Sequence, residues 1–213
     1  MSIFLLLIAF FIYTNLNTLG KVFYENNFIL DNEGWIVTGN KLKDSILHQT
    51  YSLQSSLQSS LQCDGICKTI MSHYIIAKDD LVNVDSKNKD DKNLWYFKSP
   101  PIKITLGNKK PMLLTFTLIS FMGDFRKLNR CSALIKIIHS KGETIYYPYM
   151  TKYDGNMMTF NIPLRNDLWH NENANEKAGV DFDTIFENAF EIEILGDWTQ
   201  GVEVIGLDNV QII

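Results

Sequence analysis

The sequence predicts an all-β protein built as an antiparallel sandwich of two sheets. Short runs of β-branched and aromatic residues recur along the chain, and Gly, Pro, Asn and Asp separate most of them. Helical periodicity is almost absent, and 46% of the 213 residues are hydrophobic, which is enough to fill a core. We therefore expect a single β-sandwich domain at residues 21–213, preceded by a segment of another kind at 1–20.

The first residues predict a cleaved signal peptide at 1–20. Ile3–Tyr13 reads IFLLLIAFFIY, an apolar run that is shorter than the roughly 20 residues needed to span a bilayer. Thr18 and Gly20 suit the −3 and −1 positions of a signal peptidase site, although no basic residue precedes the apolar run. A retained anchor or a buried helix is the alternative. After cleavage the protein would be secreted, with no membrane span of its own.

The expected strands are apolar or alternating runs that end at turn residues. The first begins at Trp35, directly after a DNEG turn, and stops at Gly39. Further strands are expected at 69–76, 94–98, 112–121, 133–139, 144–149, 157–162, 190–195, 203–205 and 210–213. The one helix candidate is 182–189, FDTIFENA, which is short and acidic at its start.

A polar insertion around 41–93 separates the first strand from the rest. Residues 52–62 read SLQSSLQSSLQ, whose leucines would share one side of a helix. The serines and glutamines favour a low-complexity loop instead. Residues 79–93 carry several acids among lysines, but they lack the order of oxygen ligands and glycine of an EF-hand. We expect this stretch to be a solvated loop.

The C-terminal strand is expected to close the sandwich. Val210 and Ile212 alternate with the polar Asn209 and Gln211, which is the pattern of a half-buried strand. An antiparallel sandwich closes well when its first and last strands pair, so we expect this strand to lie beside the N-terminal one. Asp208, just ahead of it, would then lie next to the N-terminal turn.

The cysteines leave the disulfide pattern open. A secretory route permits disulfides, but three cysteines, Cys63, Cys67 and Cys131, leave one thiol over or one intermolecular bond. CDGIC could close a small loop through a Cys63–Cys67 bridge, which we favour. A bond from Cys131 to one of these two is the alternative. Three sulfurs without a histidine nearby in the sequence are a poor set of zinc ligands.

Several segments carry motifs in a recognisable order. The chain opens with FILDNEGWIVTGN at 28–40, continues with NLWYFKSPPIKITLGNKKPMLLTFTL at 93–118 and NIPLRNDLW at 161–169, and ends with FEIEILGDWTQGVEVIGLDNVQI at 190–212. This series resembles the laminin B (domain IV) family and, more broadly, galactose-binding-like jelly-roll modules. The resemblance implies a jelly-roll β-sandwich. The cysteine-rich repeats that flank domain IV in laminins are absent, so the chain would be a free-standing secreted copy.

The same resemblance implies a structural calcium ion between the N-terminal turn and the last strand. Its ligands would come from Asp31, Asn32 or Glu33 and from Asp208. Calcium binds six to eight oxygens, which carboxylates and loop carbonyls can supply. In the alternative interpretation, Asp208 caps a turn by accepting hydrogen bonds from backbone N–H groups.

A glycan site would need exposed aromatic rings beside polar groups. The candidates are aromatic residues in or near turns: Tyr147, Tyr149, Trp169 and Trp198. Trp198, in the turn GDWTQG, is the best candidate for an exposed ring. The aromatic residues within strands, Trp35, Trp95 and Phe97, are expected in the core.

Composition and motifs argue against catalysis and against nucleic acid. None of the four histidines lies in a motif such as H-E-x-x-H, and no G-x-S-x-G occurs. The net charge is −4 and no basic stripe is present, so we expect no nucleic-acid partner.

We therefore expect a secreted, non-catalytic binding module. Our first hypothesis is a protein–protein interaction or adhesion subunit of an extracellular complex, held at the cell surface by docking on a membrane-anchored partner. A carbohydrate-binding, lectin-like module and a small glycan-active enzyme are the alternatives.

Overall fold

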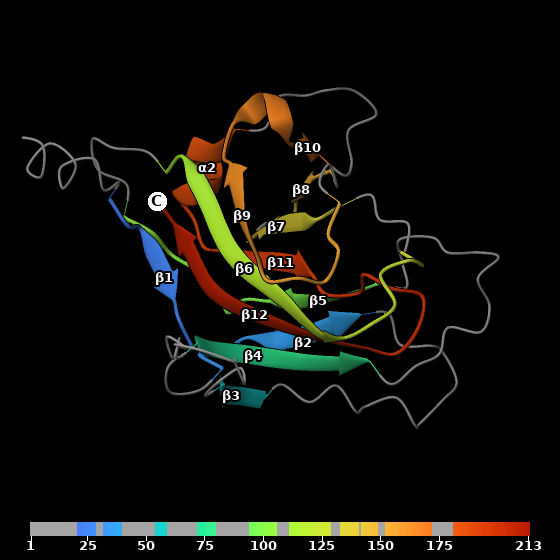
Figure 1. The fold of residues 1–213 in the computed structure, drawn as a ribbon. Coiled ribbons are helices and arrows are strands. Elements are labelled where there is room, and N and C mark those ends of the chain that lie inside the picture. Colours follow the sequence, from blue (N-terminus) through green and yellow to red (C-terminus); the bar gives the residue numbers. More distant parts are fainter. Residues whose placement is uncertain are drawn as a thin grey trace, which may run out of the picture.

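The structure is a computed structural model, and it describes residues 21–28, 32–39, 54–58, 72–79, 94–105, 111–128, 133–140, 142–148, 152–171 and 181–213. The described strands form two six-stranded sheets (Figure 1). Sheet A has the order β3-β4-β12-β6-β9, with β1 also paired to β12. Its strands are β1 (Tyr24–Asn26), β3 (Gln54–Gln58), β4 (Ser72–Asp79), β6 (Leu113–Met122), β9 (Met158–Pro163) and β12 (Glu203–Ile212).

Sheet B has the order β10-β8-β7-β11-β5-β2, and all its described pairings are antiparallel. Its strands are β2 (Ile36–Gly39), β5 (Trp95–Lys98), β7 (Ile135–His139), β8 (Thr144–Tyr147), β10 (His170–Asn171) and β11 (Phe190–Leu195). The helical elements in the described ranges are η2 (Asn166–Leu168) and α2 (Phe182–Phe186). The antiparallel β-sandwich that the sequence predicts is confirmed.

The core lies between the two sheets and is built from alternate residues of their strands. In β11 the pattern FEIEIL buries Phe190, Ile192 and Ile194 and leaves both glutamates partly exposed. Such alternation places every second side chain on the inner face of a sheet. The aromatic residues expected in the core, Trp35, Trp95 and Phe97, are all buried.

The last strand pairs near the N-terminus, but not with the first strand that the sequence predicts. The strand expected from Trp35 to Gly39 is β2, which lies in sheet B beside β5. β12 pairs instead with β1, a strand that the sequence analysis missed: Tyr24 lies opposite Ile212 and Asn26 opposite Val210. β4 pairs with the first half of β12, and β6 runs along its other edge. β12 is therefore the central strand of sheet A, as Figure 1 shows.

Asp208 differs from the expectation, because it lies within a strand rather than ahead of one. β12 is continuous for ten residues, with a shift of register against β6 between Asp208 and Gln211. Asn209 has a φ of 53° at this bulge, in the left-handed region that Asn tolerates better than most residues. The backbone N–H of Asn209 donates to Asp208 Oδ1 (2.7 Å), so the carboxylate stabilises the bulge.

The prediction of a loop at 52–62 is wrong for its central part, because residues 54–58 form the edge strand β3. Gln54 pairs with Ile76 and Gln58 with Ser72 of β4. A repeat of four residues is also a multiple of the two-residue period of a strand, so the SLQS pattern is compatible with β structure. Polar residues are typical of edge strands, where they discourage pairing with other chains.

The helix expected at 182–189 is found, although it is shorter. α2 ends at Phe186, and its first turn is capped by Asp181, whose Oδ1 accepts a hydrogen bond from the backbone N–H of Asp183 (3.1 Å). Phe182 and Phe186 are buried, with their rings stacked at 5.4 Å. This apolar face attaches the helix to the sandwich.

Candidate functional site

Three connections meet at the end of the sandwich where β6 stops and β12 starts (Figure 1). They are the segment after β6 (123–128), the segment before β9 (152–157) and the turn between β11 and β12 (196–202). Backbone hydrogen bonds hold them together: Ser120 N–H of β6 donates to Gly155 O (3.0 Å), and Gln200 N–H donates to Lys127 O (3.0 Å). We call this region the loop end.

A buried carboxylate fixes the turn between β11 and β12. Glu203 is fully buried and accepts hydrogen bonds from the backbone N–H groups of Trp198 (3.0 and 3.2 Å) and Thr199 (3.1 Å). A carboxylate can satisfy several backbone donors at once, which a neutral side chain of the same size cannot do as well. The sequence analysis missed Glu203. Its position five residues after a tryptophan, at the start of a strand, gives no recognisable motif.

The expectation that Trp198 offers an exposed ring is wrong. Its side chain is only 3% exposed, and its ring lies 4.7 Å from that of Tyr153. Its indole N–H donates to Leu195 O (3.1 Å), so its polar atom is also satisfied inside the protein. The hydrogen bonds that Trp198 and Thr199 donate to Glu203 hold the turn so that the tryptophan points into the core.

Phe125 closes the loop end against the core. Its ring packs edge-on against Tyr153 at 5.3 Å. Two glycines leave room for it: a Cβ on Gly123 would lie 2.9 Å from the ring of Phe125, and a Cβ on Gly155 would lie 2.7 Å from it. Gly155 also has a φ of 90°, which L side chains rarely adopt.

An open depression of about 770 Å³ lies over these loops. It is lined by Met122, Gly123, Asp124, Phe125, Arg126, Lys152, Asp154 and Val202. The Arg126 guanidinium donates to both oxygens of Asp124 (2.7 and 3.1 Å), and this pairing holds the pKa of Asp124 below its usual value. Asp154 accepts from the backbone and side-chain nitrogens of Asn156 (both 3.0 Å), which lowers its pKa in the same way.

Three apolar side chains are exposed beside this depression. Phe121 is 37% exposed, Met122 52% and Met157 58%. We call them the apolar patch. Tyr74 of β4 lies under it, because its ring meets Phe121 edge-on at 5.9 Å and its hydroxyl donates to Met157 Sδ (3.5 Å).

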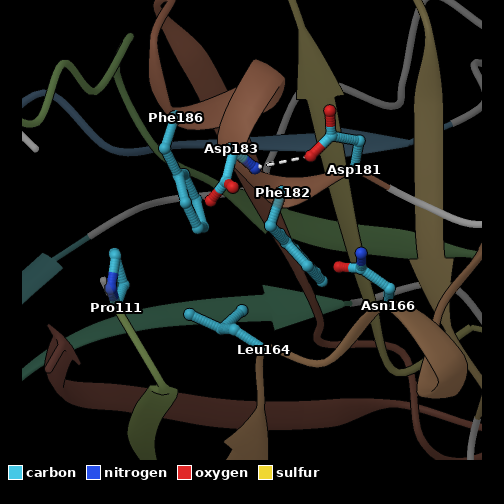
Figure 2. A pocket seen from close by; sticks show the side chains of 7 residues that line it. All are labelled: Pro111, Leu164, Asn166, Asp181, Phe182, Asp183 and Phe186. Atoms are coloured by element: carbon cyan, nitrogen blue, oxygen red, sulfur yellow. Dashed lines mark hydrogen bonds between the residues drawn. The ribbon is translucent and has the colours of Figure 1, made fainter. Parts of the chain in front are cut away.

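A second, smaller pocket of about 160 Å³ lies at the start of α2 (Figure 2). It is lined by Pro111, Leu164, Asn166, Asp181, Phe182, Asp183 and Phe186. Asp181 is engaged in capping the helix, since its other oxygen accepts from the Thr184 hydroxyl (2.7 Å). The dashed line in Figure 2 marks its bond to the Asp183 backbone. We call this the helix pocket.

The other aromatic candidates do not form an open platform. The expectation of an exposed ring at Trp169 is wrong: the residue is 4% exposed, its N–H donates to Pro163 O (2.9 Å), and its ring packs edge-on against Phe182. Tyr147 is half-buried, with its ring 5.5 Å from that of Trp169. Tyr149 lies outside the described residues.

The predicted calcium ligands are described only in part. Asp31 lies outside the described residues. Glu33 lies in a tight turn with Gly34, where both have positive φ, and its carboxylate accepts from the Asn26 side chain. Asn26 lies opposite Val210, two residues beyond Asp208, so Glu33 and Asp208 both lie near this end of β1. Burial, reinforced by the charge of Glu33, raises the pKa of nearby Tyr24 to about 12.

Within the ranges that the structure describes, no group of three or more His, Cys, Asp or Glu residues could hold a metal ion. The calcium site therefore stays a prediction. Cys63, Cys67 and Cys131 all lie outside the described residues, so their pairing also stays a prediction.

Comparison with known proteins identifies the fold. No family model matches the sequence, and no curated protein matches it. Among solved structures, the L4b domain of human laminin alpha-2 is similar, with a TM-score of 0.55 and 12% identity over 91% of this chain and 99% of that domain. The chain has the fold of a laminin L4 domain. The jelly-roll β-sandwich that the resemblance implied is thereby confirmed, and at this identity the similarity concerns the fold.

Two structures of a family 11 carbohydrate-binding module from Clostridium thermocellum are also similar to this L4-like chain. One belongs to a cellulosomal cellulase and has a TM-score of 0.46, and the other is a complex with a mixed-linked tetrasaccharide and has a TM-score of 0.45. Both share 11% identity and cover 91% of this chain. In the described residues, no helix is long and apolar enough to cross a membrane.

Proposed function

We propose that this L4-like chain is a non-catalytic binding module that recognises another protein as a secreted subunit of an extracellular or cell-surface complex. The observation that supports this most is the apolar patch beside the loop-end depression. Side chains of Phe and Met that remain exposed together on a folded domain mark interaction sites more often than isolated exposed residues do.

The composition of the loop end is that of a protein interface. Exposed apolar side chains lie beside a depression that is lined by the charged side chains of Asp124, Arg126, Lys152 and Asp154. Interfaces between proteins typically have an apolar centre enriched in aromatic residues and Met, with a polar rim that includes Arg. An open depression with the adaptable side chain of Met122 in its lining suits a side chain from a partner better than it suits a small substrate.

The alternatives draw less support from the geometry. A sugar site requires an exposed aromatic face, yet the rings of Trp198 and Trp169 are buried. A glycan-active enzyme would commonly require two carboxylates facing each other across a cleft. The acids of the loop end are instead paired with Arg126 or Asn156, and Asp181 of the helix pocket caps α2.

Co-purification tests the function. The tagged full-length protein is expressed in its native source, recovered under mild conditions, and the bound proteins are quantified by mass spectrometry. We expect one or a few extracellular or membrane-anchored proteins at near-equal molar amounts. A protein that carries no stoichiometric partner, but gives reproducible signals on a glycan array, would contradict the proposal and support the lectin-like alternative.

A further inference from the structure

We infer that Met157 is a site of reversible oxidation by peroxides, and that the hydroxyl of Tyr74 donates a hydrogen bond to the oxygen of the resulting sulfoxide. The inference concerns the free chain and does not depend on the proposed function. It follows from two observations: the sulfur of Met157 lies on an exposed side chain, and the hydroxyl that contacts it belongs to a buried ring.

Met157 presents its thioether to solvent immediately before β9. The residue is 58% exposed, and peroxides oxidise methionines that they can reach. A lone pair of the sulfur attacks one peroxide oxygen, so an S–O bond forms and the O–O bond breaks. The departing hydroxide takes the proton of the transferred oxygen and becomes water. The sulfur is thereby oxidised by two electrons and the peroxide is reduced by two, and methionine sulfoxide reductases reverse the change.

The hydroxyl of Tyr74 lies against this sulfur. Tyr74 is 2% exposed, and its hydroxyl donates to Met157 Sδ over 3.5 Å. The ring of Phe121 packs edge-on against it at 5.9 Å, and a Cβ on Gly206 would lie only 3.3 Å from the Cβ of Tyr74. These close contacts hold the tyrosine in place, so its hydroxyl stays directed toward residue 157.

The backbone of Met157 is also held on both sides of the residue. Before it, Gly155 O accepts a hydrogen bond from Ser120 N–H (3.0 Å). After it, Met158 lies opposite Leu118 in the pairing of β9 with β6. The side chain of Met157 can therefore change chemically while residue 157 stays beside the tyrosine.

Oxidation gives a buried donor a better acceptor. A thioether sulfur accepts hydrogen bonds weakly, whereas a sulfoxide is polar and carries an oxygen. A buried O–H group without a good acceptor costs free energy. Because Met157 is exposed, rotation about its Cγ–Sδ bond can bring the new oxygen to Tyr74. Most methionine oxidations disrupt packing, but this one should preserve the fold and make one edge of the apolar patch polar.

Comparison of the intact wild-type protein with Tyr74→Phe tests the inference. Both proteins are oxidised with hydrogen peroxide, each methionine is followed by peptide mapping and mass spectrometry, and Tm is measured before and after. Methionines other than Met157 affect both proteins equally. We expect the change in Tm on oxidation to be about 3 °C more favourable in the wild type, which corresponds to one hydrogen bond in a domain of this size. Sulfoxide reductases should restore the original Tm.

Two controls assign the effect to this site. In a Met157→Leu background, oxidation should change Tm equally with and without Tyr74→Phe. Without any oxidant, Met157→Gln supplies an amide oxygen in place of the sulfoxide oxygen and should melt about 3 °C above Met157→Leu. Met112 is 72% exposed and also directly precedes a strand, so Met112→Gln and Met112→Leu should differ by less than about 1 °C.

Equal changes in Tm for the wild type and Tyr74→Phe would overturn the inference. A Met157 that stays reduced after Met112 is fully oxidised would overturn it as well. If Tyr74→Phe does not fold, the substitutions at position 157 decide: Met157→Gln and Met157→Leu that melt together would show that Tyr74 does not use an oxygen acceptor there.

Discussion

The loop end and the helix pocket contain similar groups but use them differently. Each has two aspartates near aromatic side chains. At the helix pocket the phenylalanines are buried, and Asp181 completes the hydrogen bonds of the first helical turn. At the loop end the apolar patch remains exposed, although the backbone beneath it is held by a buried glutamate. Polar groups at the first site serve the fold, whereas the second site leaves apolar surface for another molecule.

Removing the Glu203 carboxylate is the strongest test of this difference. Glu203→Ala leaves three buried hydrogen bonds to Trp198 and Thr199 unmade, and we expect it to lower the free energy of unfolding by about 3 kcal/mol. Urea titration followed by tryptophan fluorescence measures this change. Glu143→Ala, at an exposed residue, is the control and should change the free energy by less than about 0.5 kcal/mol. An equal effect of the two substitutions would show that Glu203 does not hold the turn.

Comparing Gly155 of the loop end with Gly142, in the turn between β7 and β8, separates the free-energy cost of backbone strain from that of packing, because the two have similar φ. Gly155 (φ 90°) faces the ring of Phe125, whereas Gly142 (φ 82°) faces open space. Gly142→Ala should cost about 1 kcal/mol from its φ alone. Gly155→Ala adds the clash with the ring and should cost about 2–3 kcal/mol. Equal losses in urea unfolding would mean that Phe125 moves aside freely and that the loop end is less rigid than described.

In this protein a carboxylate caps a helix at Asp181 and another fixes a turn at Glu203. Calcium binding at the turn of Glu33 and the bulge of Asp208 would be a third use. If the ion binds, chelation with EGTA should lower Tm by several degrees and added calcium should restore it, because a ligand bound only by the folded state stabilises that state. Asp208→Asn should remove this sensitivity. A melting curve that chelation leaves unchanged would mean that Asp208 serves only the bulge at Asn209.

The smallest effect on stability is expected at the helix pocket. Asp181→Ala removes the cap of α2 and should cost about 1 kcal/mol, whereas Asp181→Ser retains an acceptor and should cost only a few tenths. Neither change should alter the proteins recovered on co-purification. A loss of partners in Asp181→Ala would show that the helix pocket and the loop end are coupled.

The sandwich itself could be predicted because burial in strands has a local signature. The alternation in FEIEIL and in VQII indicates which face is buried. The last strand was expected beside the strand that starts at Trp35, but it pairs with β1, whose three residues are too few to show an alternating pattern. Strand β3 was missed because its repeat of four suits several conformations.

The candidate site could not be predicted, because it depends on register and on distant residues. Trp198 reads as a turn residue, but Tyr153 and Glu203 bury it. Phe121 ends a long apolar run that suggests burial. In the pairing of β6 with β12, however, Met122 lies opposite Val204 and Ser120 opposite Ile205, so Phe121 is left out of the ladder at a bulge. No local pattern in the sequence reveals that shift.

The antiparallel pairing of β1 with β12 also has a mechanical consequence. Tyr24 lies opposite Ile212, so the polypeptide enters and leaves the domain at neighbouring points. A force that pulls Tyr24 and Ile212 apart would act across the strands, in the unzipping geometry. It would break the hydrogen bonds between β1 and β12 one after another, rather than loading them all together in shear. Pulled in this way, the domain should open at low force, beginning at the Tyr24–Ile212 pair.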